Sequence, residues 1–332
     1  MDVNLRSDEF EQSITRRYRA RLWSRFIKAI REFDLIKPND KICVCISGGK
    51  DSMVLAKLFQ QLKKHSEFSF DVEYVVMNPG YNPRNLELIK HNLEKLKIPA
   101  QIFETNIFEV AYNQTRSPCF LCAKMRRGAL YNIAKNLGCN KIALGHHFDD
   151  VIETTLMNML NVGSFQTMLP KLHSTNFEGM ELIRPLYFIR ERDIVSWRKF
   201  HNLEFLQCAC RLTEETKVDE SASQRLQTKL LIKQLLSYNS QVEMNIYRAT
   251  ENVNLDMLLG YKKGGELILT WTSVAPARFS IVMSLDIVVP RTIESSIRTI
   301  RFPATTLGLT LSFICTADSR SCCVGFIKVR PT

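Results

Sequence analysis

The chain has 332 residues, of which 45% are hydrophobic and 24% charged, the composition of a soluble globular protein with one large domain or two ordinary ones. Its 45 Lys and Arg residues outnumber its 34 Asp and Glu residues, and the net charge of +11 favours polyanionic partners. The N-terminal MDVNLRSDEF contains no apolar signal segment, and no uncharged apolar run reaches the ~20 residues of a membrane helix. We therefore expect a cytoplasmic protein with no membrane contact, whose ten cysteines are thiols or metal ligands rather than disulfides.

The first predicted element is a basic helix from about residue 8 to residue 35. An apolar stripe that contains Ile14, Leu22, Phe26 and Ile30 recurs at helical spacing. Basic side chains surround this stripe: Arg16, Arg17, Arg19, Arg21, Arg25, Lys28 and Arg31. The run Pro38-Asn39-Asp40 ends the element. Residues 1–39 are therefore interpreted as an N-terminal basic helical region.

Strand and helix patterns alternate from residue 41 onward. Strands are predicted at 41–46, 72–77, 101–105 and 141–144, and helices at 51–64, 84–97, 122–136 and 149–160. A hairpin or irregular insert is expected at 170–190, followed by helices at 191–202 and 221–237. The alternation predicts an α/β fold, a parallel twisted sheet with helices on both faces.

We assign residues 40–240 to this α/β domain and residues 241–265 to a C-terminal extension of it. Residues 266–332 form an atypical tail, because they contain only four acids and show no clear period. No function is assigned to the tail.

The run Ser47-Gly48-Gly49-Lys50-Asp51-Ser52 follows the first strand and opens the next helix. Its glycines let the backbone turn sharply and approach an anion, on which N–H groups at a helix start converge. Lys50 adds a cation, the two serines add hydroxyl donors, and Asp51 is suited to Mg²⁺ or its water. The spacing is not that of a Walker loop, and a capped strand–helix turn is the plainer alternative. The six residues together predict a phosphate-binding loop.

The segment Gly145-His146-His147-Phe148-Asp149-Asp150 lies at the end of the fourth strand and opens another helix. Two adjacent acids at a helix start are good caps, which is the structural interpretation. The functional interpretation is a carboxylate near a triphosphate, where Mg²⁺ and a lysine neutralise charge. The two histidines would then act on protons or position a substrate.

The cysteines group at two places, Cys119-Phe120-Leu121-Cys122 and Cys208-Ala209-Cys210. A C-x-x-C turn can place two thiolates on one metal, and the adjacent Lys124, Arg126 and Arg127 favour the ionised thiols. Three or four cysteines can form a structural zinc site or an iron–sulfur cluster, and spacing alone slightly favours zinc. A thioredoxin-like redox pair is a third interpretation. Cys43, Cys45 and Cys139 are expected to be buried structural thiols.

Three motifs resemble those of known enzymes. SGGKDS resembles the PP-loop of the ATP pyrophosphatases, and GHHFDDVIETTLMNML resembles the second signature that tRNA thiolases share with tRNA lysidine synthetases. PCFLCAKMRR resembles the P-C-x-x-C-x-x-x-R segment of the 2-thiocytidine synthetase (TtcA) family. The resemblance runs from about residue 40 to residue 265 and implies a Rossmann-like fold of the adenine nucleotide alpha hydrolase type.

The family resemblance implies roles for individual residues. ATP would bind the loop of residues 47–52, namely Ser47, Gly48, Gly49, Lys50, Asp51 and Ser52, together with Met77 and Gly145. Asp150, Asp51 and Arg126 would be catalytic, and Asp150, with Asp51 as an alternative, would hold Mg²⁺. A [4Fe–4S] cluster would be bound by three cysteines, Cys119, Cys122 and Cys208, with the fourth iron open to bind a sulfide. The family's later motif is C-x-x-C and this chain has C-A-C, so Cys210 is the alternative third ligand.

The implied function is ATP-dependent tRNA thiolation at a cytidine of the anticodon loop, position 32. The C2 oxygen would be adenylated and then replaced by sulfur from a cysteine desulfurase or free sulfide. Arg16, Arg19, Lys124 and Arg127 would hold the tRNA, and the family also suggests a homodimer. Two alternatives remain open. A tRNA lysidine synthetase would share both nucleotide motifs but has no need of the cysteines, and a non-catalytic, zinc-containing RNA-binding protein would not use the loop.

Overall fold

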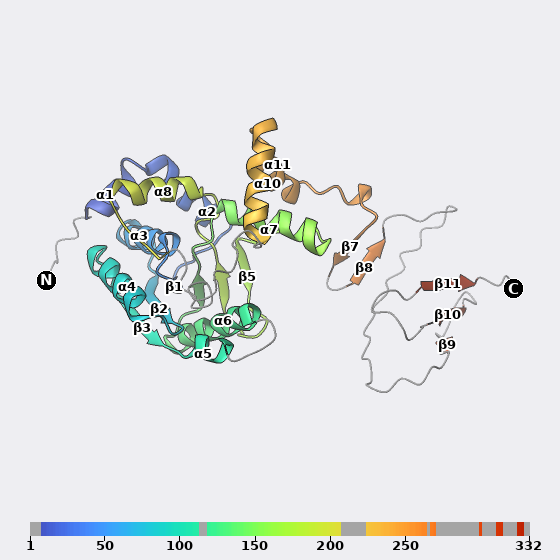
Figure 1. Cartoon of the computed structure of the whole chain (residues 1–332), viewed down its shortest axis with the longest axis horizontal. Coiled ribbons are helices and arrows are strands. Elements are labelled where there is room, and N and C mark those ends of the chain that lie inside the picture. The colour runs from blue at the N-terminus through green and yellow to red at the C-terminus, as the bar shows by residue number, and fades with distance from the viewer. Residues whose placement is uncertain are drawn as a thin grey trace. The chain divides into compact units, whose positions relative to one another are not determined.

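The computed structural model describes residues 8–112, 118–206, 224–263, 266–269, 299–300, 310–314 and 324–328 (Figure 1). The chain divides into two compact units, Met1–Val253 and Asn254–Thr332. All the motifs described above belong to the first unit.

A six-stranded sheet forms the centre of the first unit, in the order β3-β2-β1-β4-β6-β5. The strands are β1 (Lys41–Ile46), β2 (Asp71–Asn78), β3 (Ala100–Glu104), β4 (Lys141–Ala143), β5 (Lys171–His173) and β6 (Glu181–Ile183). Neighbouring strands from β3 to β6 pair in parallel, and β5 pairs antiparallel with β6. The predicted parallel α/β sheet is therefore confirmed. The insert expected at 170–190 is a hairpin that widens the sheet by two strands.

Helices cover both faces of this sheet (Figure 1). They are α3 (Lys50–His65), α4 (Pro83–Lys95), α5 (Ile107–Tyr112), α6 (Pro118–Asn136), α7 (Phe148–Met157), α8 (Glu191–Phe200), α10 (Gln224–Tyr238) and α11 (Val242–Glu251). Side chains of β1 alternate between two cores, because successive strand residues point to opposite faces. Ile42, Val44 and Ile46 pack in the core that includes α3 and α4, whereas Cys43 and Cys45 pack in the core that includes α6. Both cysteines are buried, as the sequence predicts.

The helix predicted over residues 8–35 is interrupted. Helix α1 (Glu9–Thr15) ends in a turn, a π-helical segment spans Arg19–Trp23, and α2 (Ser24–Glu32) leads toward β1. Buried apolar residues recur at every fourth position: Phe10, Ile14, Tyr18, Leu22, Phe26 and Ile30. In a regular α-helix this spacing would rotate the stripe by about 40° per step, since one turn takes 3.6 residues. The turn and the wider π-helical segment absorb that drift.

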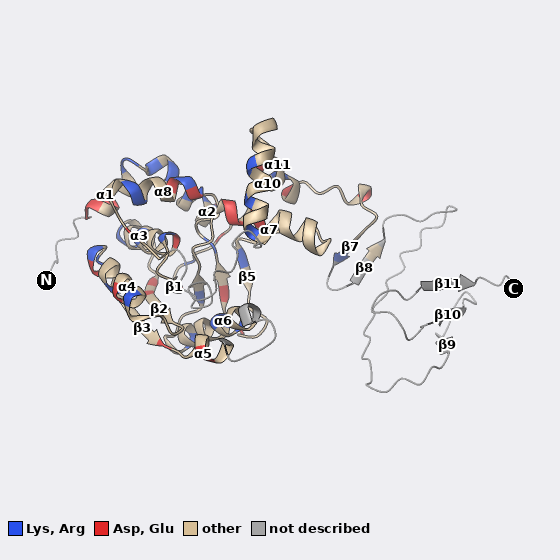
Figure 2. Ribbon diagram, in the orientation of Figure 1, with Lys and Arg blue, Asp and Glu red and all other residues tan. Residues whose placement is uncertain are grey.

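The interrupted N-terminal helix packs on α3 and α8. The side chain of Lys57 in α3 is fully buried, and its Nζ lies 2.6 Å from Asp8 Oδ2 and 3.1 Å from Glu11 Oε1. Trp197 of α8 donates its indole N–H to Ser13 Oγ at 2.8 Å. These buried polar contacts fix the segment to the domain, and basic residues remain on its outer side (Figure 2).

In the second unit, the described residues form two antiparallel sheets. β7 (Gly260–Lys263) pairs with β8 (Glu266–Leu269), and β10 (Thr310–Ile314) pairs with β9 (Thr299–Ile300) and β11 (Val324–Lys328). Across the residues described in both units, no helix is both long and apolar enough to span a bilayer.

Candidate nucleotide-binding edge

The glycine loop leaves β1 at the carboxyl edge of the sheet, where ligands of parallel α/β folds bind. Gly48 has φ +82°, and a Cβ there would lie 2.7 Å from a side-chain carbon of Ile89, so glycine is required. Gly49 is the N-cap of α3 and has no side-chain capping bond. Ser52 Oγ accepts the N–H of Ser47 at 3.1 Å and donates to Gly49 O at 2.9 Å. The loop is thus held open over the start of a helix, the arrangement that binds phosphate.

Lys50 and Asp51 occupy the first turn of α3 and are paired with each other. Lys50 Nζ lies 3.2 Å from Asp51 Oδ2. Burial raises the pKa of Asp51 above its ordinary value, although His147 and Lys50 act in the opposite direction. Asp51 Oδ1 is buried and has no hydrogen-bond partner in the described part of the chain. A buried oxygen without a donor is a ready ligand for a metal ion or its water.

Gly145 carries the chain from β4 past the glycine loop. A Cβ on Gly145 would lie 3.1 Å from the carbonyl carbon of Asp51 and from the nitrogen of Ser52, so a larger residue would force the backbone of the loop to shift. His147 caps α7: its N–H donates to Asp150 Oδ2 at 2.9 Å, and Asp150 N–H points back to Nδ1 at 3.4 Å. His147 Nε2 lies 3.8 Å from Asp51 Oδ1. The two predicted motifs therefore meet at one edge.

Further charged residues complete this edge from α8 and α10. Lys50 Nζ lies 2.9 Å from Glu191 Oε1, and Lys229 Nζ lies 3.1 Å from Glu191 Oε2. Burial alone would raise the pKa of Glu191, but Lys50 and Lys229 outweigh it and lower the pKa to about 2. Glu191 therefore stays ionised and bridges the loop lysine to α10.

The same network of ion pairs continues from α10 to α7. Lys229 Nζ lies 3.5 Å from Glu153 Oε1, and Arg225 Nε donates to Glu153 Oε2 at 2.7 Å. Arg225 Nη2 donates to Asp150 Oδ1 at 2.7 Å. We call this set the charged ring; its members are Lys50, Asp51, His147, Asp150, Glu153, Glu191, Arg225 and Lys229.

Asp149 has a different environment from Asp150. Its Oδ2 accepts the backbone N–H of Glu191 at 2.7 Å, and its Oδ1 lies 3.1 Å from Arg190 Nη2. Arg190 also pairs with Glu243 of α11 at 2.5 Å. Asp149 thus fixes the start of α8 against α7, and its Oδ2 also lies 3.8 Å from His147 Nδ1. Of the two carboxylates, Asp150 is the one that pairs with Arg225 in the charged ring.

Helix α6, which carries the C-x-x-C motif and is called the cysteine helix below, is connected to the glycine loop by Tyr81. The hydroxyl of Tyr81 donates to Ser47 O at 3.3 Å. Burial raises the pKa of Tyr81, the Arg126 guanidinium lowers it, and the Cys122 thiol raises it, so both groups lie within electrostatic reach of the phenol. Two of the predicted site residues of α6 are therefore near the loop. Met77 lies at the carboxyl end of β2, next to β1 in the sheet.

The other predicted cluster ligands are less fully described. The backbone of Cys119 belongs to α6, but its side chain, Cys208 and Cys210 lie outside the described residues. Leu206 precedes Cys208 by two positions, and its N–H donates to Gly48 O at 3.3 Å. No group of three His, Cys, Asp or Glu residues suited to a metal ion occurs within the described ranges.

The basic residues predicted to bind RNA fall into two places. Lys124 and Arg127 are exposed on α6. Arg16 and Arg19 line a pocket with Gln61 and His65, in the last turns of α3. Gln61 and His65 lie 11 and 15 residues after Lys50 in α3, a rise of about 17–23 Å along the helix. The structure does not bring Arg16 and Arg19 to the nucleotide edge.

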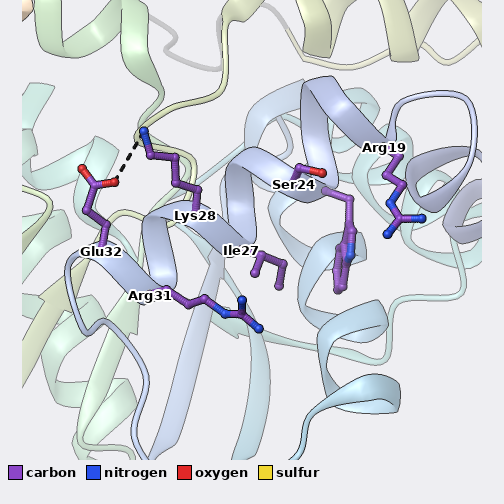
Figure 3. Close-up of a pocket in the computed structure, with 7 residues that line it drawn as sticks. Arg19, Ser24, Ile27, Lys28, Arg31 and Glu32 are labelled. Carbon is purple, nitrogen blue, oxygen red and sulfur yellow. Dashed lines mark ion pairs between the residues drawn. The ribbon is translucent and has the colours of Figure 1, made fainter.

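A second pocket of about 750 Å³ continues from Arg19 and Trp23 along α2 (Figure 3). Figure 3 shows Arg19 on one side of it and Lys28, Arg31 and Glu32 on the other, and Lys28 pairs with Glu32 at 3.5 Å. We call these two adjoining pockets the N-terminal groove. The groove is basic and contains an aromatic side chain, a composition that suits nucleic acid.

Sequence reasoning missed Glu191, Arg225, Lys229 and Arg184 as residues of this edge. Arg184 directly follows β6, so it lies at the same carboxyl edge as Gly145. A short apolar strand followed by Arg-Pro could have indicated this position. The other three have no local signal, because each contacts residues far away in the sequence.

Comparison with known proteins agrees with this geometry. A PP-loop domain family model matches residues 19–214. A tRNA-cytidine(32) 2-sulfurtransferase of Pelobacter propionicus is 33% identical over 72% of this chain and 87% of its own length. The enzyme of the same name from Geobacter metallireducens is 32% identical over 70% of this chain and 89% of its own.

One solved structure also resembles the fold. It is the U34-tRNA thiolase NcsA from Methanococcus maripaludis with its [4Fe-4S] cluster, with a TM-score of 0.55 at 21% identity. The match covers 72% of this chain and 80% of that protein. At this identity the similarity supports the fold alone.

Proposed function

Because the chain belongs to the PP-loop family and, within it, to the tRNA-cytidine(32) 2-sulfurtransferases, we propose that it is an ATP-dependent tRNA thiolase acting on a cytidine of the anticodon loop, position 32. The enzyme class rests on the relatives, and the mechanism below rests on the nucleotide-binding edge. The observation that carries the mechanism is the approach of Gly145 to the glycine loop, which brings Asp51 and Asp150 to the same place.

ATP is proposed to bind with its phosphates over the glycine loop, at the start of α3. Lys50 supplies a cation, and backbone N–H groups at the helix start supply donors. Met77 and Gly145 lie at the ends of the two strands that flank β1, where they would line the nucleotide. The Gly48 and Gly145 positions fit this assignment, because added side chains would collide with the loop and its neighbours.

Mg²⁺ fits the same edge. In the charged ring, four carboxylates face the three cations Lys50, Arg225 and Lys229. The buried, unpaired Oδ1 of Asp51 needs a donor or a metal. Asp51 and Asp150 would hold the ion or its water, and the ion would neutralise part of the phosphate charge.

The first chemical step is adenylation. The C2 oxygen of the cytidine attacks the α-phosphorus of ATP, the bond to the bridging oxygen breaks, and pyrophosphate leaves. Sulfur then bonds to C2, and AMP departs with the original oxygen. Lys50 would stabilise the charge on the departing pyrophosphate, and Arg126 would orient the base or the adenylated intermediate near Tyr81.

A [4Fe–4S] cluster is proposed to be held by Cys119, Cys122 and either Cys208 or Cys210. When bound, it would hold the sulfide that a cysteine desulfurase or free sulfide provides. Two observations support its place near the nucleotide. Cys122 packs against the core that contains Tyr81, which bonds to Ser47, and Leu206 bonds to Gly48 just before the later cysteines.

The test is nucleoside mass analysis of tRNA treated with reconstituted protein, ATP, Mg²⁺ and sulfide. We expect 2-thiocytidine with the wild type, none with Cys122→Ala, and wild-type yield with Cys139→Ala, whose thiol is buried in the α6 core. A Cys122→Ala protein that still forms 2-thiocytidine would refute the cluster mechanism.

The two alternatives give different results in the same preparation. A lysidine synthetase would join lysine to the base and contain no acid-labile sulfide. A zinc-containing RNA-binding protein would bind tRNA but release no pyrophosphate from ATP. The names of the relatives favour thiolation over both.

A further inference from the structure

Arg184 is a buried cation without an anionic partner. It is 8% exposed and follows β6 at the carboxyl edge of the sheet. One of its guanidinium nitrogens donates to Leu169 O, and its Nε is buried with no hydrogen-bond partner. Within the described ranges no carboxylate forms an ion pair with it. A buried charge normally pairs with an opposite charge, so this environment calls for an external anion.

His146 presents a second unpaired polar atom beside Arg184. It lies at the end of β4, the strand next to β6, and its Nδ1 is buried without a partner among the described residues. Burial, together with the positive charge of Arg184, lowers the pKa of His146 to about 4. The ring is therefore neutral near pH 7, and its Nδ1 can donate a hydrogen bond in the appropriate tautomer.

Arg127 brings a third group from the cysteine helix. The pKa of Arg184 is lowered to about 10, chiefly by burial; Arg127 also lowers it, whereas Asp150 raises it. Arg127 is exposed and has no ion pair in the described part of the chain. Tyr131, one turn further along α6, also acts on Arg184, and its ring stacks on Phe177 at 4.8 Å.

We infer that Arg184, Arg127 and His146 form a binding site for a phosphate group of the RNA backbone next to the reacting nucleotide. The guanidinium fork of a buried arginine matches two phosphate oxygens, and an exposed second arginine can meet the same group from solvent. The inference rests on the proposed function, because it takes the RNA to be the tRNA substrate.

Two features favour RNA over the phosphates of ATP as the source of this group. ATP phosphate binding is already provided by the glycine loop on β1, and β6 is two strands away from β1 in the sheet order. Strands are spaced by roughly 4.8 Å, so Arg184 would lie about 10 Å from the loop. That separation leaves room for a nucleobase between the two phosphate sites.

A purely structural role is the competing explanation. The Arg184 side chain donates to Leu169 O, and its backbone N–H donates to Pro170 O at 2.9 Å, so the residue fixes the segment before β5. A structural role would alter stability alone, whereas a phosphate contact also alters the salt dependence of RNA binding. Each lost contact to single-stranded RNA should lower the slope of log Kd against log salt by about 0.7.

The experiment measures tRNA affinity over a range of salt concentrations for Arg184→Gln, Arg184→Lys and Arg127→Gln in the full-length protein. We expect a slope lower by about 0.7 and an affinity at least about tenfold weaker for both Gln variants. Arg184→Lys should keep the slope but bind more weakly, because the fork is lost. Lys135→Gln, an exposed lysine in the last turn of α6, is the matched control and should behave as wild type.

A second arm measures the affinity for a non-hydrolysable ATP analogue. We expect it to be unchanged in all variants. A loss of nucleotide affinity with an unchanged RNA slope would assign the site to ATP and overturn the inference. An unchanged slope in Arg127→Gln, whose exposed side chain is not needed for folding, would also overturn it, even if Arg184→Gln failed to fold. Wild-type protein that binds no tRNA would instead overturn the proposed function.

Discussion

The charged ring and the Arg184 site lie on one edge of the sheet but differ in how they balance charge. Every cation of the ring has a carboxylate within 3.5 Å. Arg184 has no ion pair among the described residues, and its Nε has no hydrogen bond. A self-neutralised ring can receive an anion when a divalent cation accompanies it, whereas an unpaired arginine can bind an anion directly. The two regions should therefore respond differently to mutation, to Mg²⁺ and to pH.

The largest expected effect comes from Lys50. Lys50→Met removes the cation closest to the glycine loop, and loss of one preorganised charge contact typically lowers kcat by about 100-fold or more. The measurement is tRNA-dependent pyrophosphate release from ATP at saturating Mg²⁺. Lys63→Met, at the exposed far end of the same helix, is the control and should retain wild-type turnover. Equal rates in Lys50→Met and wild type would show that the charged ring does not belong to the phosphate site.

Gly145→Ala is expected to have the next largest effect. Its Cβ would lie 3.1 Å from the backbone of Asp51, so the loop must shift, with a loss of about 1–3 kcal/mol in the free energy of unfolding. We also expect weaker binding of the ATP analogue, since the shifted backbone carries the phosphate donors. Urea unfolding and calorimetric titration measure the two quantities.

Gly128→Ala is the matched control for that substitution. Gly128 lies inside α6, and a Cβ there meets no atom within 4 Å. The variant should be more stable by about 0.5–1 kcal/mol, because alanine loses less backbone entropy in a helix. If both alanine variants had the same stability, the close approach of Gly145 would be unimportant.

Arg225→Gln should have a smaller effect on stability, because it disturbs mainly the contacts of the charged ring. Arg225 links Asp150 to the buried Glu153, but its own side chain is 47% exposed, so solvent screens the interaction. We expect a loss of about 1 kcal/mol or less, and therefore a melting temperature lower by about 2–4 °C. Lys233→Gln, exposed on the same helix, should not change the melting temperature. A loss of stability as large as that expected for Gly145→Ala would mean that α10 depends on this arginine for its position.

The sequence predicted the parts of this edge that depend on local patterns. The glycine loop, the Gly145–Asp150 segment and the strands that carry them follow from apolar runs interrupted by glycine and acidic residues, and all occur where expected. The prediction of a continuous N-terminal helix was wrong. Apolar residues at every fourth position satisfy a helical pattern, but in a regular helix the stripe that they form drifts around the axis, and the structure interrupts the helix.

The ring and the Arg184 site could not be predicted in the same way. Glu191 meets Lys50, and Lys229 meets Glu191, only because α8 and α10 return to the start of α3. Such contacts depend on the crossover connections of the fold, which no local window of sequence contains. Arg184 differs in that its position after a short strand was visible, but its lack of a partner was not.

The last expected effect concerns acid stability and changes only below about pH 5. The pKa of Glu191 is about 2, below the ordinary glutamate value near 4.3, because Lys50 and Lys229 outweigh the effect of burial. A carboxylate with a lowered pKa in the folded state stabilises it above the unfolded pKa, and this contribution is lost as the pH falls toward 2. Glu191→Gln removes the contribution, so the difference in unfolding free energy between wild type and variant should shrink steadily from pH 5 to pH 2.

The control is Asp71→Asn, whose partner Lys63 lies 3.0 Å away on the exposed surface. The pKa of Asp71 is also lowered by Lys63, but solvent screens this pair, so 0.5 M salt should largely remove its pH dependence. The Glu191 difference should survive the same salt, because the ring is partly buried and each of its charges has two partners. If salt abolished both differences equally, the ring would be no more than a set of surface ion pairs, and the contrast with Arg184 would lose its physical basis.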